Sequence, residues 1–369
     1  MAARLDERAA APGIRRVTRD YEEWLRRQTA VIARDLRRKH AQMASSPFAF
    51  LRATYYRWAQ LWPLQCGDLA KAPIVTSVGD LHIENFGTWR DAEGRLAWGV
   101  NDFDEAAPLP YTNDLVRLTS SAFLALREDR LALSQAVVCR AILSAYHATL
   151  CAGGRPLILA EGHRKLRERI LDCLIEPTRF WGEKLGSDLR RTPRPSKPCR
   201  EALMRALPAG STRVRIRARV AGLGGLGRAR FVAIAEWTGS RVAREARAFV
   251  PSAALWASEG QPPQPTTAHV AKLIAGSVRS RDPFLQMSGG WTLRRLAPES
   301  GKIRLATLGQ PVLEVQLLEF MGSELANVHL ATPRATREIL RDLGRRGSLW
   351  LGKAAERMAR CVEQDHAAW

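Results

Sequence analysis

The sequence predicts a two-lobed α+β protein, for three reasons. The chain has 369 residues, more than one compact domain usually holds. Patterns typical of amphipathic helices fill much of the first half and return from residue 312, whereas residues 212–250 alternate as antiparallel strands do. The apolar fraction of 46% and the charged fraction of 25% are ordinary for a globular protein, so a large core is expected.

Four segments are expected along the chain, and the first is helical. Residues 17–44 carry apolar side chains at helical spacing among basic ones, which predicts one long amphipathic helix. Ser46 before Pro47 is typical of a helix start, so a second helix follows. Aromatic side chains of that helix are expected in the core: Phe48, Phe50, Tyr55, Tyr56 and Trp58. We place the four segments at residues 1–75, 76–190, 191–310 and 311–369.

The second segment begins with short strands. Residues 72–78 are apolar and β-branched, as in a buried strand. Residues 86–90 and 95–100 flank Asp91-Ala92-Glu93-Gly94, which indicates a hairpin. Helical patterns cover residues 113–150 and 160–186.

The third segment is expected to be a β-rich lobe after a linker. Residues 187–211 are rich in proline and arginine, which favours a linker. Three antiparallel strands are then predicted, at residues 212–221, 228–237 and 241–250. A helix near 266–280 and strands at 284–296 and 303–308 follow, before helices complete the chain.

Composition narrows the classes of function. The net charge is +20, but 49 of the 57 basic residues are arginines spread along the whole chain, so nucleic-acid binding is an alternative and not the favoured function. The six cysteines include no C-x-x-C pair, which disfavours a zinc site and a disulfide framework. No apolar run of about 18 residues and no secretory signal occurs, which favours a cytoplasmic protein.

Residues 79–106, GDLHIENFGTWRDAEGRLAWGVNDFDEA, are the most informative segment. Asn85 follows Asp80 by five residues, and Asp102 ends the predicted hairpin. Phosphoryl transfer needs one carboxylate to accept the proton of the attacking hydroxyl, and an amide oxygen with a second carboxylate to hold Mg²⁺. We therefore expect Asp80 to be catalytic and Asn85 and Asp102 to bind metal. Asp104 is either a second metal ligand or a surface acid, and His82 is expected to brace the loop.

A glycine-rich loop is the second chemical signal. Residues 222–227 read Gly-Leu-Gly-Gly-Leu-Gly, a G-x-G-x-x-G pattern. A dinucleotide-binding fold needs a helix directly after the glycines, but RARFVAIAEW follows here and is predicted to be a strand. Kinases cover ATP phosphates with a strand, glycine loop and strand. A tight hairpin without a ligand is the alternative. The candidate phosphate-binding glycines are Gly222, Gly224, Gly225 and Gly227.

The loop of Asp80 resembles the catalytic and metal-binding loops of aminoglycoside-phosphotransferase-like kinases. Their pattern is roughly H-G-D-L-H-x-x-N followed by I-D-F or I-D-W, with Val78 here in place of the first histidine. The resemblance implies that Asp80 is the base and that Asn85 and Asp102 bind the metal. It also implies that Asp114 braces the catalytic loop.

The order of these motifs implies a circularly permuted protein-kinase-like fold. In ordinary kinases the glycine loop precedes the catalytic loop, whereas here it follows, and residues 322–329 resemble the helix that normally comes before the catalytic loop. The whole chain resembles a bacterial family of unknown function with this same order. The shared motifs are Ser46-Pro47-Phe48, residues 79–87, residues 101–105, the glycine loop and Pro251-Ser252.

One position departs from the kinase pattern. The resemblance implies a phosphate-binding lysine four residues before Pro251-Ser252, where this chain has Arg247. Arginine keeps the charge but is larger and planar. The next predicted helix lacks the usual carboxylate and offers Lys272. Arg247 and Lys272 are therefore the remaining candidate nucleotide-binding residues.

The sequence thus predicts a phosphotransferase that uses ATP and Mg²⁺ (or Mn²⁺) on an unidentified acceptor. Arg247 favours a first alternative, a nucleotide-binding pseudokinase with a regulatory or scaffolding role. A metal-dependent phosphatase, suggested by Asp80-Leu81-His82, is disfavoured because the other six histidines stand apart in the sequence. The second alternative is a basic nucleic-acid-binding protein, whose affinity would fall steeply with salt.

Overall fold

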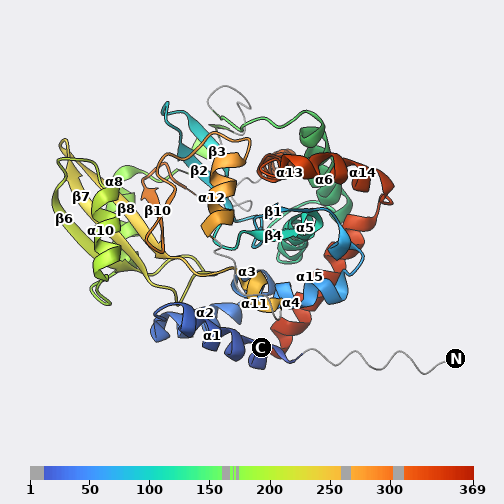
Figure 1. Cartoon of the computed structure of the whole chain (residues 1–369), viewed down its shortest axis with the longest axis horizontal. Coiled ribbons are helices and arrows are strands. Elements are labelled where there is room, and N and C mark those ends of the chain that lie inside the picture. The colour runs from blue at the N-terminus through green and yellow to red at the C-terminus, as the bar shows by residue number, and fades with distance from the viewer. Residues whose placement is uncertain (1–11, 160–166, 169, 172–173, 259–266, 302–310) are drawn as a thin grey trace.

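The computed structural model of this protein describes residues 12–159, 167–168, 170–171, 174–258, 267–301 and 311–369. It shows a mixed α+β protein in which helices and antiparallel sheets occupy different parts of the molecule (Figure 1). A six-stranded sheet lies on the left of Figure 1, and long helices pack together on the right. The α+β class expected from the sequence is therefore confirmed.

Short helices form the N-terminal segment, and two of them replace the single helix predicted over residues 17–44. The chain leaves helical geometry because Val31 forms an antiparallel bridge with Arg228, and the Ile32 N–H donates to the Gly227 carbonyl at 2.9 Å. Val31 and Ile32 are β-branched, which suits an extended conformation. The prediction of one helix was wrong because tertiary pairing outweighs helical propensity there. The helices are α1 (Ile14–Gln28), α2 (Ala33–Met43), α3 (Pro47–Ala53) and α4 (Tyr55–Gln65).

Ser46 caps α3, as predicted from the sequence. Its hydroxyl accepts a hydrogen bond from the Ala49 N–H at 3.2 Å, and Pro47 occupies the first turn, where its missing N–H has no intrahelical role. The aromatic side chains that follow are all at most 5% exposed, which confirms that they belong to the core: Phe48, Phe50, Tyr55, Tyr56 and Trp58. Their placement on one helix was wrong, because Thr54 leaves helical geometry (φ −124°, ψ 41°) and separates α3 from α4.

Two small antiparallel sheets frame the segment that contains Asp80. The Asp91 carboxylate accepts the N–H groups of Glu93 and Arg95, and Gly94 takes a positive φ of 74°, so the turn between the second pair of strands is closed tightly. The strand predicted over residues 72–78 and the hairpin after it are confirmed. A 3₁₀-helix η1 (Leu69–Lys71) precedes the strands β1 (Ile74–Ser77), β2 (Phe86–Arg90), β3 (Leu96–Val100) and β4 (Ala107–Pro110), which pair β1 with β4 and β2 with β3.

Long helices build the right-hand part of Figure 1. The helical pattern predicted over residues 113–150 is confirmed as two helices, because the chain reverses at Asp129, whose φ is 54°, and the Ser134 hydroxyl then caps a new helix. Gly322 allows two of the helices to touch, since a Cβ there would lie 2.2 Å from the Ile142 carbonyl oxygen. The elements are α5 (Tyr111–Arg127), α6 (Gln135–Cys151), α13 (Pro311–His329), η4 (Pro333–Ala335), α14 (Thr336–Arg345) and α15 (Trp350–Ala368).

The left-hand part is one antiparallel sheet in the order β5-β6-β7-β8-β10-β9. The three strands predicted within residues 212–250 and the strand predicted near 284–296 are confirmed, the last as two short strands. The strand predicted at 303–308 lies outside the described residues. The strands are β5 (Leu189–Arg190), β6 (Thr212–Arg219), β7 (Arg230–Trp237), β8 (Ser240–Ala248), β9 (Gln286–Ser288) and β10 (Trp291–Leu296).

The segment predicted as a linker, residues 187–211, contains structure. Strand β5 and helix α10 (Lys197–Ala206) lie within it, and α10 packs Cys199 and Leu203 against one face of the sheet. The linker prediction was wrong because Ser196 and the prolines begin a helix here, with the Ser196 hydroxyl accepting the Cys199 N–H. Residues 160–166 of the helix predicted before it lie outside the described part, and the later portion consists of α8 (Pro177–Arg179), the π-helical turn η2 (Phe180–Lys184) and α9 (Leu185–Asp188).

Two further helices connect the two parts. α11 (Ala253–Ala257) packs on α4, and α12 (Thr267–Gly276) confirms the helix predicted near residues 266–280 and lies between the sheet and the long helices in Figure 1. The C-terminal helix α15 returns to the N-terminal helices, where Asp365 pairs with Arg57 at 2.7 Å. The C-terminal helix is thus fastened to α4.

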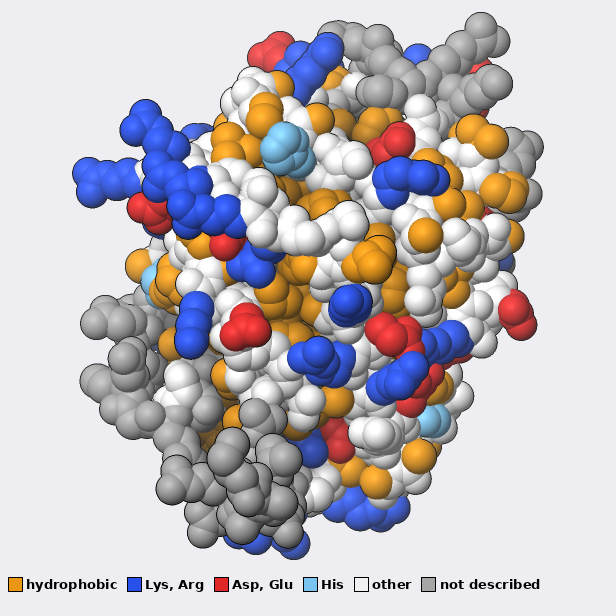
Figure 2. Space-filling model, turned by 90° about the vertical axis from the view of Figure 1, so that its right-hand side faces the viewer, with side chains coloured by type: hydrophobic (Ala, Val, Ile, Leu, Met, Phe, Trp, Pro, Cys, Tyr) orange, Lys and Arg blue, Asp and Glu red, His pale blue; other side chains and the backbone are white. Residues whose placement is uncertain are grey.

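The surface over the long helices carries charge of both signs. Figure 2 shows this face, where basic side chains lie among acidic and apolar ones instead of forming one continuous basic surface. None of the described helices has both the length and the apolar character needed to span a membrane. The cysteines among the described residues are all free thiols.

Candidate functional site

A cavity of about 610 Å³ lies between the sheet and the segment that follows β1. Most of the predicted site residues line it: Asp80, Asn85, Asp102, Asp104, Gly222, Gly224, Gly225 and Arg247. Gly227 and Lys272 are not among its lining residues, and Lys272 is exposed on α12. The volume is that of an ordinary small-molecule site.

Asp80 lies at the end of a braced turn. Strand β1 ends at Ser77, and the Asp114 carboxylate accepts the N–H groups of Val78 and Gly79 at 2.7 and 3.0 Å. His329, at the end of α13, lies 3.2 Å from the same carboxylate. Gly79 has a φ of 83°, and a Cβ there would lie 2.3 Å from a backbone oxygen, so only glycine fits. These contacts hold the Asp80 backbone from two helices, as the resemblance implies for Asp114.

A buried arginine holds the Asp80 side chain. Arg117 of α5 is fully buried, and its guanidinium donates to Asp80 Oδ1 and, at 2.9 Å, to the Leu51 carbonyl. The rings of Tyr55 and Trp58 lie on the guanidinium, each with its centroid 4.9 Å from Cζ. One carboxylate oxygen of Asp80 is therefore committed to Arg117, and the other, Oδ2, faces the glycine loop.

Asn85 links the two acidic loops. Its side-chain N–H groups donate to the backbone carbonyls of Asp80 and Asp102 at 3.0 and 3.3 Å, so the amide oxygen is the atom left for an external ligand. His82 accepts the Glu84 N–H on Nδ1, which agrees with the expected loop-bracing role. The structure therefore brings Asn85 and Asp102 together across the hairpin.

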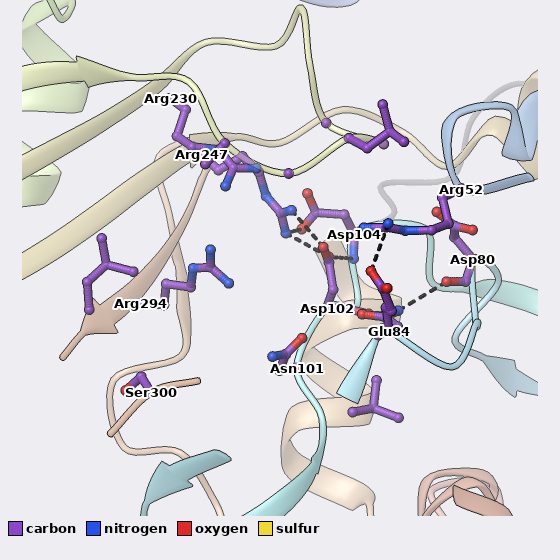
Figure 3. A pocket seen from close by; sticks show the side chains of 18 of the residues that line it. Arg52, Asp80, Glu84, Asn101, Asp102, Asp104, Arg230, Arg247, Arg294 and Ser300 are labelled. Carbon is purple, nitrogen blue, oxygen red and sulfur yellow. Dashed lines mark hydrogen bonds and ion pairs between the residues drawn. The ribbon is translucent and has the colours of Figure 1, made fainter. Parts of the chain in front are cut away.

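Arg247 of β8 lies on the carboxylates of Asp102 and Asp104 (Figure 3). Its guanidinium donates to both Asp102 oxygens at 2.7 and 2.8 Å, and lies 2.5 Å from Asp104. Burial lowers the pKa of Arg247, but Asp102 and Asp104 outweigh this and raise it above its ordinary value. Burial also raises the pKa of Asp104, against the effect of Arg247. This bidentate pairing is the strongest that a carboxylate and an arginine make.

The oxygen donors here suit a hard cation such as Mg²⁺. An amide oxygen from Asn85 and a carboxylate from Asp102 are the ligand types that Mg²⁺ takes, with phosphate and water oxygens completing the shell. Among the described residues, no three His, Cys, Asp or Glu side chains are grouped so as to hold a metal by themselves. A cation bound here would therefore depend on ligand phosphates, and it would compete with Arg247 for the Asp102 oxygens.

The glycine loop lies directly over Asp80. A Cβ added at Gly224 would lie 3.6 Å from Asp80 Oδ2 and 3.0 Å from the Arg52 carbonyl oxygen. Gly227 has a φ of 97°, and a Cβ there would meet the Leu36 side chain of α2 at 2.5 Å. The glycines thus permit close approach to α2 and to the Arg52 carbonyl, which side chains at these positions would crowd.

Lys39 holds the outer side of the glycine loop. Its Nζ donates to the Gly224 carbonyl at 3.4 Å and lies over the Tyr56 ring. Burial lowers the pKa of Lys39 to about 8, and nearby Arg228 acts in the same direction. A buried, poorly compensated lysine therefore lies behind the loop.

Glu105 joins the acidic segment to the sheet. Its carboxylate accepts Arg228 at 2.7 Å and the Ala253 N–H at 2.7 Å, and the Ser252 hydroxyl donates to its backbone carbonyl at 3.0 Å. These bonds give the Pro251-Ser252 motif a structural role, because they fix the end of β8 against the loop of Asp102.

Sequence reasoning missed several side chains that surround the cavity. Arg117 follows Asp114 by one helical turn, but nothing local reveals that its partner is Asp80. The alternation of β7 and β8 could have revealed that Arg230, Glu245 and Arg247 share a sheet face, since residues two apart on a strand do so. Lys39 belongs to a helix far away in the sequence, and no sequence signal connects it to Gly224.

Comparisons with known proteins give one family. Residues 5–171 match the model of a family described as "uncharacterized protein conserved in bacteria (DUF2252)". The match supports the expected similarity to a bacterial family. It includes Asp80, Asn85, Asp102 and Asp114, whereas the glycine loop and Arg247 lie beyond it. No curated protein and no solved structure matches the chain.

Proposed function

We propose that this protein is a phosphotransferase that uses ATP and Mg²⁺, built on a circularly permuted protein-kinase-like fold. One observation carries the proposal: the glycine loop lies over Asp80, although Gly224 and Asp80 are 144 positions apart in the sequence. A strand, glycine loop and strand above a catalytic aspartate is the arrangement that phosphoryl transfer in kinases requires.

Each side chain then has a role that follows from its contacts. Asp80 orients the acceptor hydroxyl and takes its proton through Oδ2, while Arg117 holds Oδ1 and so fixes the carboxylate. Backbone N–H groups of the glycine loop would approach the phosphates, because the glycines carry no side chains that keep a ligand away. Asn85 and Asp102 would hold Mg²⁺, which neutralises phosphate charge when bound.

The expected circular permutation is supported by the position of α13. This helix is near the C-terminus of the chain, yet its last residue, His329, contacts the Asp114 carboxylate that braces the catalytic turn. Glu324 of the same helix is fully buried and accepts the Val100 N–H at 3.1 Å, just before Asp102. These are the contacts expected of the helix that precedes the catalytic loop in the sequence of an ordinary kinase.

The pairing of Arg247 with Asp102 favours a second candidate, a nucleotide-binding pseudokinase with a regulatory role. A guanidinium that already satisfies both Asp102 oxygens can take the place of a cation there. Nucleotide would then bind without productive phosphoryl transfer.

Asp80→Asn separates the two candidates. In a phosphotransferase it leaves ATP affinity nearly unchanged and lowers turnover by a factor on the order of 10² to 10⁴, the loss expected for a general base. Slow ATP hydrolysis measures turnover when no acceptor is known, and calorimetry measures affinity. The exposed Asp68→Asn is the matched control, since it removes the same charge outside the cavity. Equal hydrolysis by wild type and Asp80→Asn, with ATP bound by both, would contradict the phosphotransferase and favour the pseudokinase.

A further inference from the structure

Three arginines stand side by side on the cavity face of the sheet. Arg230 of β7 and Arg247 of β8 are directly opposed cross-strand partners. Ala218 of β6 pairs with Phe231, so Arg219 lies next to Arg230 in the same row. Neighbouring strands are about 4.8 Å apart, so the row spans about 10 Å. Like charges placed opposite each other destabilise a sheet unless opposite charge is supplied.

The next row on this face supplies part of that charge through Glu245. Its side chain is 1% exposed and accepts hydrogen bonds from Arg219 and Arg294, both at 2.6 Å. Burial raises the pKa of Glu245, but the surrounding guanidiniums outweigh this and hold it well below its ordinary range. Arg219 has a second partner in Asp188 at 3.1 Å. One buried carboxylate is thus shared by several arginines.

Arg230 is the least compensated member of the row. Its Nη1 lies 3.5 Å from both Glu245 oxygens, much farther than the other two arginines that share this carboxylate. The pKa of Arg230 is lowered to about 10, mainly by burial and also by Arg247 and Arg294, against the opposing effect of Glu245. Additional negative charge beside Arg230 would therefore be strongly favourable.

The guanidinium of Arg230 lies directly beneath the glycine loop. Its Nη2 is 3.1 Å from the point where a Cβ of Gly225 would stand and 3.3 Å from that of Gly222. Figure 3 shows Arg230 and Arg294 on one side of the cavity and Asp102 on the other. The glycine loop and these guanidiniums therefore line one cavity, and guanidinium N–H groups are strong donors to anions such as phosphate.

We propose that Arg230 and Arg294, with Arg247 beside them, form a subsite that binds a chain of linked phosphates without needing a metal. The subsite deepens the proposed function, on which it rests, because it assigns the polyphosphate of the donor to arginines of the sheet. A chain of two or three phosphates is long enough to meet several of these guanidiniums, whereas a single orthophosphate meets fewer. The same chemistry serves a nucleoside triphosphate and an inorganic polyphosphate.

Binding of inorganic tripolyphosphate in the presence of EDTA tests the subsite. Calorimetry on wild type is expected to show tripolyphosphate binding at least tenfold tighter than orthophosphate. Arg230→Gln is expected to weaken tripolyphosphate binding at least tenfold, because charge-assisted hydrogen bonds are lost. Arg244→Gln is the matched control: it removes the same charge from β8, but Arg244 faces away from the cavity and donates to the Ala206 carbonyl.

The Arg230→Gln variant is expected to fold, because Glu245 keeps Arg219 and Arg294 as partners. Arg230→Lys, which keeps a positive charge, provides a second test and is expected to retain part of the affinity. Tripolyphosphate binding that appears only after Mg²⁺ is added would overturn the proposal, as would equal binding by wild type and Arg230→Gln.

Two further measurements distinguish a nucleotide from an inorganic polyphosphate, and failure of the subsite from failure of the phosphotransferase. ATP that binds tighter than tripolyphosphate in EDTA supports the subsite and identifies a nucleotide, while equal affinity supports it and identifies inorganic polyphosphate. Tripolyphosphate binding that depends on Arg230, in a protein without ATP hydrolysis, would leave the subsite standing and remove the phosphotransferase. ATP hydrolysis that is unaffected by Arg230→Gln would remove the subsite and leave the phosphotransferase standing.

Discussion

Replacing Lys39 by methionine should change how the stability of this protein depends on pH. The side chain is only 6% exposed, and burial lowers its pKa from 10.5 to about 8. Below pH 8 the lysine is protonated in both the folded and the unfolded protein, so the folded state bears the full cost of a buried charge. As pH rises above 8, the folded protein releases this proton first, the unfolded state binds more protons, and the free energy of unfolding increases.

The size of the effect follows from the pKa difference. One pKa unit corresponds to about 1.4 kcal/mol, so the first pH unit above 8 should add roughly 1 kcal/mol, and the whole window up to pH 10.5 about 3 kcal/mol. Methionine fills similar space without charge, so Lys39→Met should lack this increase. Other groups, such as Cys199 with its pKa raised to about 12, titrate equally in both proteins and cancel in the difference.

Urea unfolding of wild type and Lys39→Met at pH 7, 8, 9 and 10 measures this difference. Above pH 8, the free energy of unfolding of wild type should increase relative to that of Lys39→Met. Lys71→Met, at an exposed position, is the control and should follow wild type. Parallel profiles for wild type and Lys39→Met would refute the reasoning, because Lys39 would then keep the same pKa in both states.

Two more predictions concern the scaffold of the site. Arg117→Leu should lower the free energy of unfolding by about 3–5 kcal/mol, measured by urea unfolding, because it leaves the largely buried Asp80 carboxylate without its cationic partner. A loss below about 1 kcal/mol would show that the pair behaves like an exposed one. Gly227→Ala should destabilise more than Gly210→Ala in the same measurement: both have positive φ, but the methyl group meets a leucine at 2.5 Å only at residue 227. Equal losses would mean that backbone strain alone matters.

The helix predictions succeeded where the signal was local and failed where a partner outside the helix intervened. Ser46 and Pro47 specify the start of α3 by themselves, because capping needs only the next three residues. Residues 29–32 carry a helical pattern as well, but Val31 pairs with Arg228, nearly 200 positions later. No window of sequence around Val31 contains that information.

The same distinction applies to the site. The spacing of Asp80, Asn85 and Asp102 predicted that they belong together, because a hairpin of fixed length returns the chain to its start. Arg247 was predicted from its position before Pro251, but its bidentate contact with Asp102 was not. That contact depends on how the sheet is placed over the hairpin, which long-range packing decides.

By itself, the sequence determined the short elements of this protein: the hairpin, the helix caps, the strands of the sheet and the acidic and glycine-rich loops. Each depends on residue types within a few positions, where backbone geometry and alternation act directly. Only the tertiary structure decided that Gly224 lies over Asp80, that Arg117 holds Asp80, and that Arg230 lies beneath the glycine loop. Burial makes these contacts strong, and burial is a property of the packed chain, since side chains from distant segments must exclude water together.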